Sequence, residues 1–108
     1  MSRYLFIQSQ DPFIEARTSS QFDVATQLAK AGKTVSVLLV QNGVTAARKG
    51  ARTPQFDALA GAGIKVFADS FALQQRDITA GDLKPSIAAG DVGMVVDAML
   101  AGDKVIWN

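Results

Sequence analysis

One short pattern occurs three times in this chain: alanine, glycine, two further residues and valine. Its copies begin at Ala31, Ala62 and Ala101. A glycine just after a helix is typical of a left-handed C-terminal turn, which glycine adopts without steric cost, and the valine favours a strand. Each copy therefore predicts a helix that ends and a strand that begins. Three such joints predict an alternation of helices and strands, as in a parallel α/β sheet.

The segments between the joints complete this alternation. Val35–Val40 is continuously apolar, which indicates a strand covered on both faces. We predict an α/β fold, a three-layer sandwich with a five-stranded, mainly parallel sheet, formed by one domain over residues 1–108. The expected strands are Tyr4–Gln8, Val35–Val40, Ile64–Ala68, Ser86–Ala88 and Val105–Trp107. The expected helices are Ser19–Ala31, Pro54–Ala60, Ser70–Asp77 and Val92–Ala101.

Several polar residues precede the predicted helices. Thr18 followed by Gln21 matches a capping box, in which two side chains satisfy the first free N–H groups. Thr53 and Asp91 are expected to cap the helices that follow them. Asp69 ends a predicted strand directly before a helix, so it is expected either to cap that helix or to contact a ligand.

The composition excludes several kinds of chemistry. The chain contains neither cysteine nor histidine. Disulfides, thiolate nucleophiles and Cys-ligated metals are therefore impossible, and the commonest general base is missing. We expect no metal and no cofactor.

Charge and hydropathy exclude further partners. A net charge of +1 provides no general attraction for nucleic acid. No apolar run approaches the ~20 residues of a membrane helix, and the N-terminal segment is a poor signal peptide. We therefore expect a cytoplasmic protein that binds neither nucleic acid nor membrane.

Polar residues gather where the predicted strands end. The carboxyl ends of parallel strands meet at one edge of a sheet, where α/β proteins commonly bind ligands. We expect a pocket for a small polar ligand at that edge, although Asn42 and Gly43 are also a typical turn sequence. The strand-end candidates are Ser9, Gln10, Asp11, Asn42, Gly43, Asp69 and Ser70.

The connection from Gln41 to Arg52 is long for a compact α/β unit. It carries Arg48, Lys49 and Arg52 among small residues. These cations suit an anion or an acidic partner, or are simply solvated. With little apolar periodicity to anchor it, residues 42–53 are expected to be the most mobile part of the chain.

The segment Ile64–Ile78 carries a family resemblance. With Val66, Ala68, Asp69, Leu73, Arg76 and Ile78 at these spacings, it resembles the strand-loop-helix signature of the DsrE/DsrF-like family. The resemblance extends over an opening YLFIQSQDP, a helix ending in AKAG, the strand TVSVLLV and a closing VIWN. It implies a small α/β protein associated with intracellular sulfur relay. In the sulfur-carrying members a cysteine accepts sulfur as a persulfide at the position that Asp69 occupies here.

The resemblance implies a non-catalytic DsrE-like protein that binds a partner protein or a small anion in a sulfur-relay context. It also implies a homo-oligomer, and it adds Arg76 to the candidate ligand-binding residues. Two alternatives remain open. The first is a small enzyme that uses Asp69 as its acid–base group. The second is a structural subunit of a hetero-oligomer with a cysteine-bearing relative.

Overall fold

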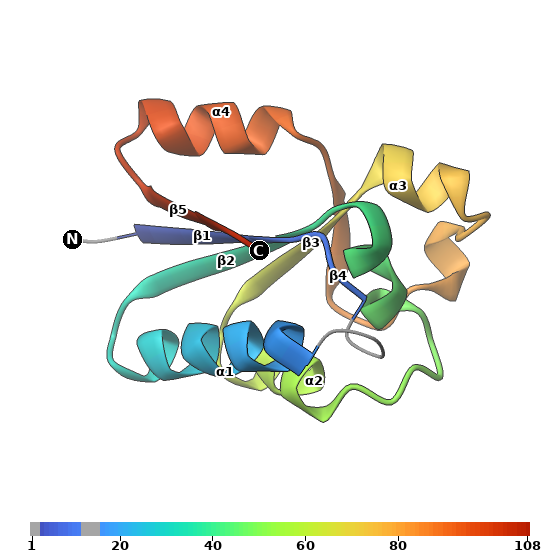
Figure 1. Cartoon of the computed structure of the whole chain (residues 1–108), viewed down its shortest axis with the longest axis horizontal. Helices are drawn as coiled ribbons and strands as arrows, with labels where there is room; N and C mark the ends of the chain where they lie inside the picture. Colours follow the sequence, from blue (N-terminus) through green and yellow to red (C-terminus); the bar gives the residue numbers. More distant parts are fainter. Residues whose placement is uncertain (1–2, 12–15) are drawn as a thin grey trace.

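The computed structural model describes residues 3–11 and 16–108. Strands and helices alternate along the chain, as Figure 1 shows. The first half contains β1 (Arg3–Gln8), α1 (Ala16–Lys30), β2 (Thr34–Leu39), the 3-10 helix η1 (Gln41–Ala47) and α2 (Pro54–Gly61). The second half contains β3 (Lys65–Asp69), α3 (Ser70–Gln75), the 3-10 helix η2 (Ala80–Asp82), β4 (Ile87–Gly90), α4 (Gly93–Leu100) and β5 (Lys104–Trp107).

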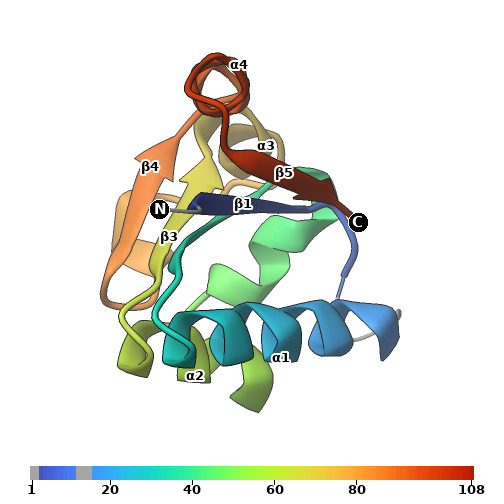
Figure 2. The ribbon, with the colours of Figure 1, turned by 90° about the vertical axis from the view of Figure 1, so that its left-hand side faces the viewer.

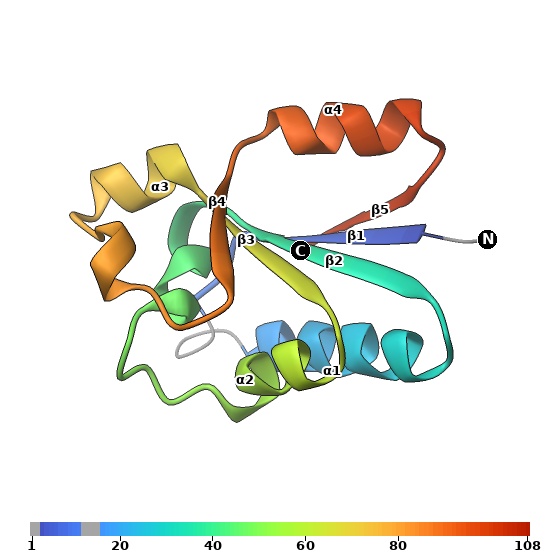
Figure 3. The same cartoon turned by 180° about the vertical axis from the view of Figure 1, so that it is seen from behind.

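The strands form a single parallel sheet in the order β4-β3-β2-β1-β5. The predicted α/β fold with a five-stranded sheet is confirmed. Helices α1 and α2 cover one face, and α4 covers part of the other (Figures 1 and 2). Seen from behind, η1, α3 and η2 gather at the carboxyl edge of the sheet, as Figure 3 shows. No helix in the described part of the chain is long and apolar enough to cross a membrane.

Side chains alternate across the sheet and form two clusters of unequal size. Phe6 points toward α1 and α2, where Phe22 and Phe56 meet edge to face with ring centroids 5.4 Å apart. Leu5 and Ile7, its neighbours in β1, point to the opposite side and join the smaller cluster under α4. The α4 face of the sheet is therefore the less completely covered one.

The three repeated joints have the predicted geometry. In each, the glycine has a positive φ, and the next residue donates its N–H to the carbonyl five positions earlier, which defines a Schellman motif. The glycines are Gly32 (φ 89), Gly63 (φ 79) and Gly102 (φ 81). The bonds run from Lys33 to Leu28, from Ile64 to Leu59 and from Asp103 to Ala98.

Most of the predicted boundaries agree with the structure to within one or two residues, and the start of α1 is the main error. This helix begins at Ala16 rather than Ser19, so Thr18 and Gln21 lie inside it and the predicted capping box is wrong. Both side chains are buried against the sheet side of the helix rather than turned back to its first turn. Thr53 occupies its predicted N-cap position but makes no side-chain capping hydrogen bond; its hydroxyl accepts from Lys84 Nζ at 2.8 Å.

The long connection after β2 is more ordered than its composition indicates. Residues 41–47 form η1, in which Val44, Ala46 and Ala47 are completely buried. Further along, Lys49 donates its N–H to the carbonyl of Asp82 at 2.7 Å. The premise that this segment lacks an apolar anchor is therefore wrong.

Candidate functional site

Asp69 ends β3 and caps α3. Its Oδ2 accepts the N–H of Ala72 at 3.0 Å, and only 8% of the residue is exposed. This bond satisfies one of the N–H groups that the first turn of a helix leaves free. The predicted capping role is confirmed, and the carboxylate is held in place at the carboxyl edge.

Arg76 and Asn42 meet beside this cap. Arg76 leaves the end of α3 and donates to the side-chain oxygen of Asn42 at 2.7 Å and to the carbonyl of Ala72 at 3.1 Å. The pair joins α3 to η1 across 34 residues of sequence. Arg76 forms no ion pair with any residue that the structure describes. Its guanidinium is thus a positioned cation without a described counter-charge.

Ser70 connects the start of α3 to the neighbouring strand. Its hydroxyl donates to the carbonyl of Gly90 at 3.2 Å. The next residue, Phe71, is 65% exposed, which is unusual for a large aromatic side chain. Asp69, Ser70 and Phe71 therefore present a carboxylate, a hydroxyl and an aromatic ring on consecutive positions.

The candidates after β1 serve mainly to hold the end of that strand. Ser9 donates both its N–H and its hydroxyl to the carbonyl of Asn108, at 2.9 and 2.8 Å. Gln10 donates its N–H to the side chain of Gln8 at 2.9 Å. Asp11 is half-buried at the end of the described part of this loop. The hydrogen bonds of Ser9 and Gln10 thus run to the C-terminal residue and to β1 rather than toward Asp69.

Gly43 contributes through its lack of a side chain. It is buried, and a Cβ at this position would overlap the carbonyl oxygen of Gln8. Only glycine lets η1 approach the end of β1 so closely. Gly43 therefore determines where η1, and with it Asn42, lies.

A buried polar pair lies nearby that the sequence did not indicate. Gln8 is completely buried and donates to Gln21 at 2.6 Å. Gln21 Nε2 and Thr18 Oγ1 are buried without a hydrogen-bond partner among the described residues. The only sequence signal was a glutamine at the end of an otherwise apolar strand, and such a residue more often faces solvent.

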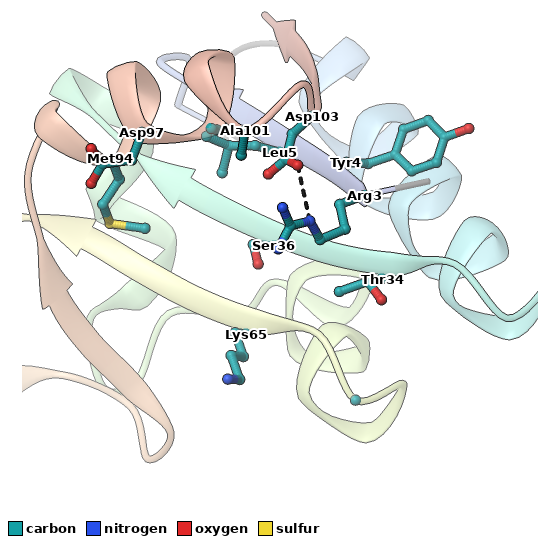
Figure 4. Close-up of a pocket in the computed structure, with 12 residues that line it drawn as sticks. Arg3, Tyr4, Leu5, Thr34, Ser36, Lys65, Met94, Asp97, Ala101 and Asp103 are labelled. Carbon is teal, nitrogen blue, oxygen red and sulfur yellow. Dashed lines mark hydrogen bonds and ion pairs between the residues drawn. The ribbon is translucent and has the colours of Figure 1, made fainter. Parts of the chain in front are cut away.

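Three cavities of the described structure lie away from this cluster. One of about 450 Å³ opens between α4 and the amino-terminal halves of the central strands (Figure 4). Two others, of about 490 and 260 Å³, lie along β3 and β4. None of these three includes Asp69, Asn42 or Arg76, so we treat the candidate site as a surface cluster rather than the expected pocket. Within residues 3–11 and 16–108 no three acidic side chains converge as a metal site.

Two basic residues of the long connection, Arg48 and Lys49, lie near η2. Two hydrogen bonds from Thr79, from its backbone N–H and from its hydroxyl, lower the pKa of Asp82, and the charges of Lys49 and Arg48 add smaller effects in the same direction. These cations are therefore placed beside a carboxylate of the chain itself.

Comparison with known proteins identifies one family. The DsrE/DsrF-like family profile matches residues 2–107. No match was found among curated proteins. Similar solved structures include the ychN protein from E. coli, with a TM-score of 0.89, 16% identity and 100% of both chains covered.

Two further structures have the same fold. A protein of unknown function from Methanobacterium thermoautotrophicum has a TM-score of 0.84, with 20% identity and 100% of both chains covered. One from Bacteroides thetaiotaomicron has a TM-score of 0.81 and 12% identity, covering 99% of this chain and 95% of that one. At these identities the likeness establishes the fold alone.

Proposed function

Because this chain belongs to the DsrE/DsrF-like family, we propose that it is a non-catalytic member that binds a partner protein or a small anion in a cytoplasmic sulfur-relay context. One observation carries the proposal. The family resemblance implies that the sulfur-carrying members have their cysteine at the position of Asp69, whose carboxylate here caps α3. A chain without cysteine cannot hold a persulfide of its own. We therefore assign a binding role, for a partner protein or a small anion, to the carboxyl edge of the sheet.

Arg76 supplies the binding charge. A guanidinium has five N–H donors in a planar fork that suits oxyanions, and among the described residues Arg76 bonds to Ala72 and Asn42 alone. Those two bonds fix its position, so little conformational entropy is lost when an anion binds. Asp69 does not compete directly, because its Oδ2 faces the N–H of Ala72.

Phe71 favours a protein as the natural partner. Phe71 is exposed in the first turn of α3, the helix that Arg76 follows, and aromatic and arginine side chains are both enriched at the energetic centres of protein interfaces. The proposed binding surface therefore consists of Asn42, Ser70, Phe71 and Arg76. An acid–base role for Asp69 has less support, since its carboxylate is committed to the cap.

A titration tests the anion-binding part. Isotope-labelled protein is titrated with thiosulfate while the amide signals of Asn42, Phe71 and Arg76 are followed by NMR. We expect saturable shifts, and in Arg76→Gln a loss of affinity of about 10-fold or more. Arg52→Gln, which removes a cation from the long connection instead, should bind as the parent does. Equal affinity in both variants would contradict the proposal.

A second titration tests the partner. A purified cysteine-bearing DsrE-like protein in its persulfide form is added to the parent and to Phe71→Ala. We expect binding to the parent and weaker binding to the variant, by about 10-fold. Unchanged binding would show that Phe71 is not part of the proposed binding surface.

We also propose that the chain forms a homo-oligomer. The proposal is supported by the family resemblance and by several large apolar side chains that are exposed in the isolated chain. Light scattering at micromolar concentration should give a mass of at least twice 11.4 kDa. A mass equal to that of one chain would contradict it.

A further inference from the structure

Helix α4 is apolar on two opposite sides. Its inner side, with Met94, Val95 and Ala98, packs on the sheet. The outer side carries Val92, Val96, Met99 and Leu100, which are 61%, 56%, 62% and 83% exposed. At 100° per residue these four span a stripe about 100° wide, which is the width of a stripe that normally faces a core. A helix with apolar side chains on both its inner and its outer side is normally buried on both, and the outer side of α4 has no cover among the described residues.

The stripe continues onto the edge of the sheet. Val105 packs under α4, and Trp107, two residues further along β5, points to the same side of the sheet. Trp107 is 62% exposed. Figure 2, which looks nearly along α4, shows no described element above this helix. We define the α4 surface as Val92, Val96, Met99, Leu100 and Trp107.

The size of the α4 surface fits one side of a dimer. With these exposed fractions, each side chain offers roughly 100 Å², so the surface provides about 500 Å² of apolar area. A standard interface buries about 800 Å² per partner, of which some 60% is apolar. The surface thus supplies the apolar share of such an interface, and a polar rim would complete it.

The α4 surface contains no charged residue, so a second copy of the same chain can pack on it without burying a charge. Asp97 is the one charged residue of α4, and it lies on the flank that lines the cavity in Figure 4, away from the stripe. A two-fold rotation that sets the helices antiparallel places both Asp97 carboxylates on the same flank of the pair, outside the contact between the stripes, where each stays exposed to solvent. It also sets the two helix dipoles antiparallel, which is favourable.

We propose that two copies of this chain pack their α4 helices antiparallel about a two-fold axis near Val96. The pairing deepens the proposed self-association by naming the surface that carries it. Most homo-oligomers are built on such two-fold contacts, in which the same patch serves on both chains. Helix axes at about 8–10 Å bring the two Val96 side chains face to face.

The absence of cysteine makes a clean cross-linking test possible. Val96→Cys introduces one thiol per chain, close to the axis. Under a mild oxidant such as oxidised glutathione, we expect a disulfide-linked dimer of twice 11.4 kDa on a non-reducing gel. Val24→Cys is the matched control, because Val24 is also an exposed valine on a helix, 48% exposed on α1. It should cross-link at least about 10-fold more slowly.

The outcomes separate the two proposals. If the parent scatters light as a monomer, both self-association and this surface are wrong. If the parent is oligomeric but Val96→Cys cross-links no faster than Val24→Cys, the α4 surface is wrong and self-association stands.

A second variant does not depend on disulfide geometry. Val96→Glu places two carboxylates face to face and should raise the dimer dissociation constant by about 100-fold. Circular dichroism should show the parent's helix content, because Val96 is exposed in the single chain. The fluorescence of Trp107, the only tryptophan, should then shift to longer wavelength as it becomes solvated. A folded Val96→Glu protein that dimerises as the parent does would overturn the proposal.

Discussion

Replacing Asp69 by alanine tests whether the cap is a buried one. The change removes the 3.0 Å bond to Ala72 and leaves that N–H unpaired in a residue that is 2% exposed. N-cap losses range from about 0.5 to 2 kcal/mol, and an unpaired buried donor costs about 1–3 kcal/mol. Because water cannot easily replace the lost acceptor, we expect a loss near the top of the capping range, about 2 kcal/mol.

Asp91→Ala is the matched control. Asp91 Oδ1 accepts the N–H of Gly93 at 2.8 Å, but both residues are exposed, so water takes over that bond. Its loss should be below about 1 kcal/mol. Urea unfolding with fluorescence of Trp107 measures both, from the midpoint and an unchanged slope. Equal losses in the two variants would refute the argument from burial.

Asp69→Cys extends the test to the family's chemistry. Its thiol would lie at the start of α3, where the helix dipole lowers a thiol pKa and raises the thiolate fraction. We expect the variant to take one sulfur atom from a persulfide donor, an increase of about 32 Da in intact mass that a reductant reverses. A thiol that titrates near 8.5, as a free cysteine does, and takes up no sulfur would show that the site lost its electrostatics along with its cysteine.

Two further predictions concern the packing around η1 and η2. Gly43→Ala should destabilise the fold by about 3 kcal/mol in urea, because its Cβ overlaps the backbone of Gln8, whereas Gly61→Ala, with open space around it on α2, should be neutral or stabilising by up to about 1 kcal/mol. The lowered pKa of Asp82 means that its contribution to stability is complete above its ordinary value of 3.8 and is lost as the pH falls below it. The protection factor of the Leu83 amide, the factor by which it exchanges more slowly than in an unfolded chain at the same pH, should therefore fall below about pH 4 in the parent but not in Asp82→Asn.

The parts of the fold that the sequence predicted are those that local chemistry determines. The joints at Gly32, Gly63 and Gly102 each need a residue with a positive φ directly after a helix. The cap at Asp69 needs a carboxylate three residues before a free N–H. Such requirements are visible in a short stretch of sequence. The same locality placed the strands and most of the helices.

The errors arise where distant segments decide. Gln21 bonds to Gln8 because α1 packs on β1. Thr18 and Gln21, which matched a capping box in the sequence, therefore lie within α1 instead of at its start. The burial of Val44 and its small neighbours in η1 likewise depends on segments far away in the chain. Both partners of the Asn42–Arg76 pair were candidates, but their contact spans 34 residues, and no local pattern reports it.

The position of β1 inside the sheet has a consequence for how the chain folds. Its partner on one side, β2, follows closely, but its partner on the other, β5, arrives last, and the Arg3–Asp103 ion pair between them spans 100 residues. Four strands can assemble while one side of β1 stays bare, with Leu5 and Ile7 only partly covered. Closing so large a loop is slow compared with pairing neighbours. At a synthesis rate of about 5–20 residues per second, a ribosome that stalls before residue 104 leaves this edge open to other chains.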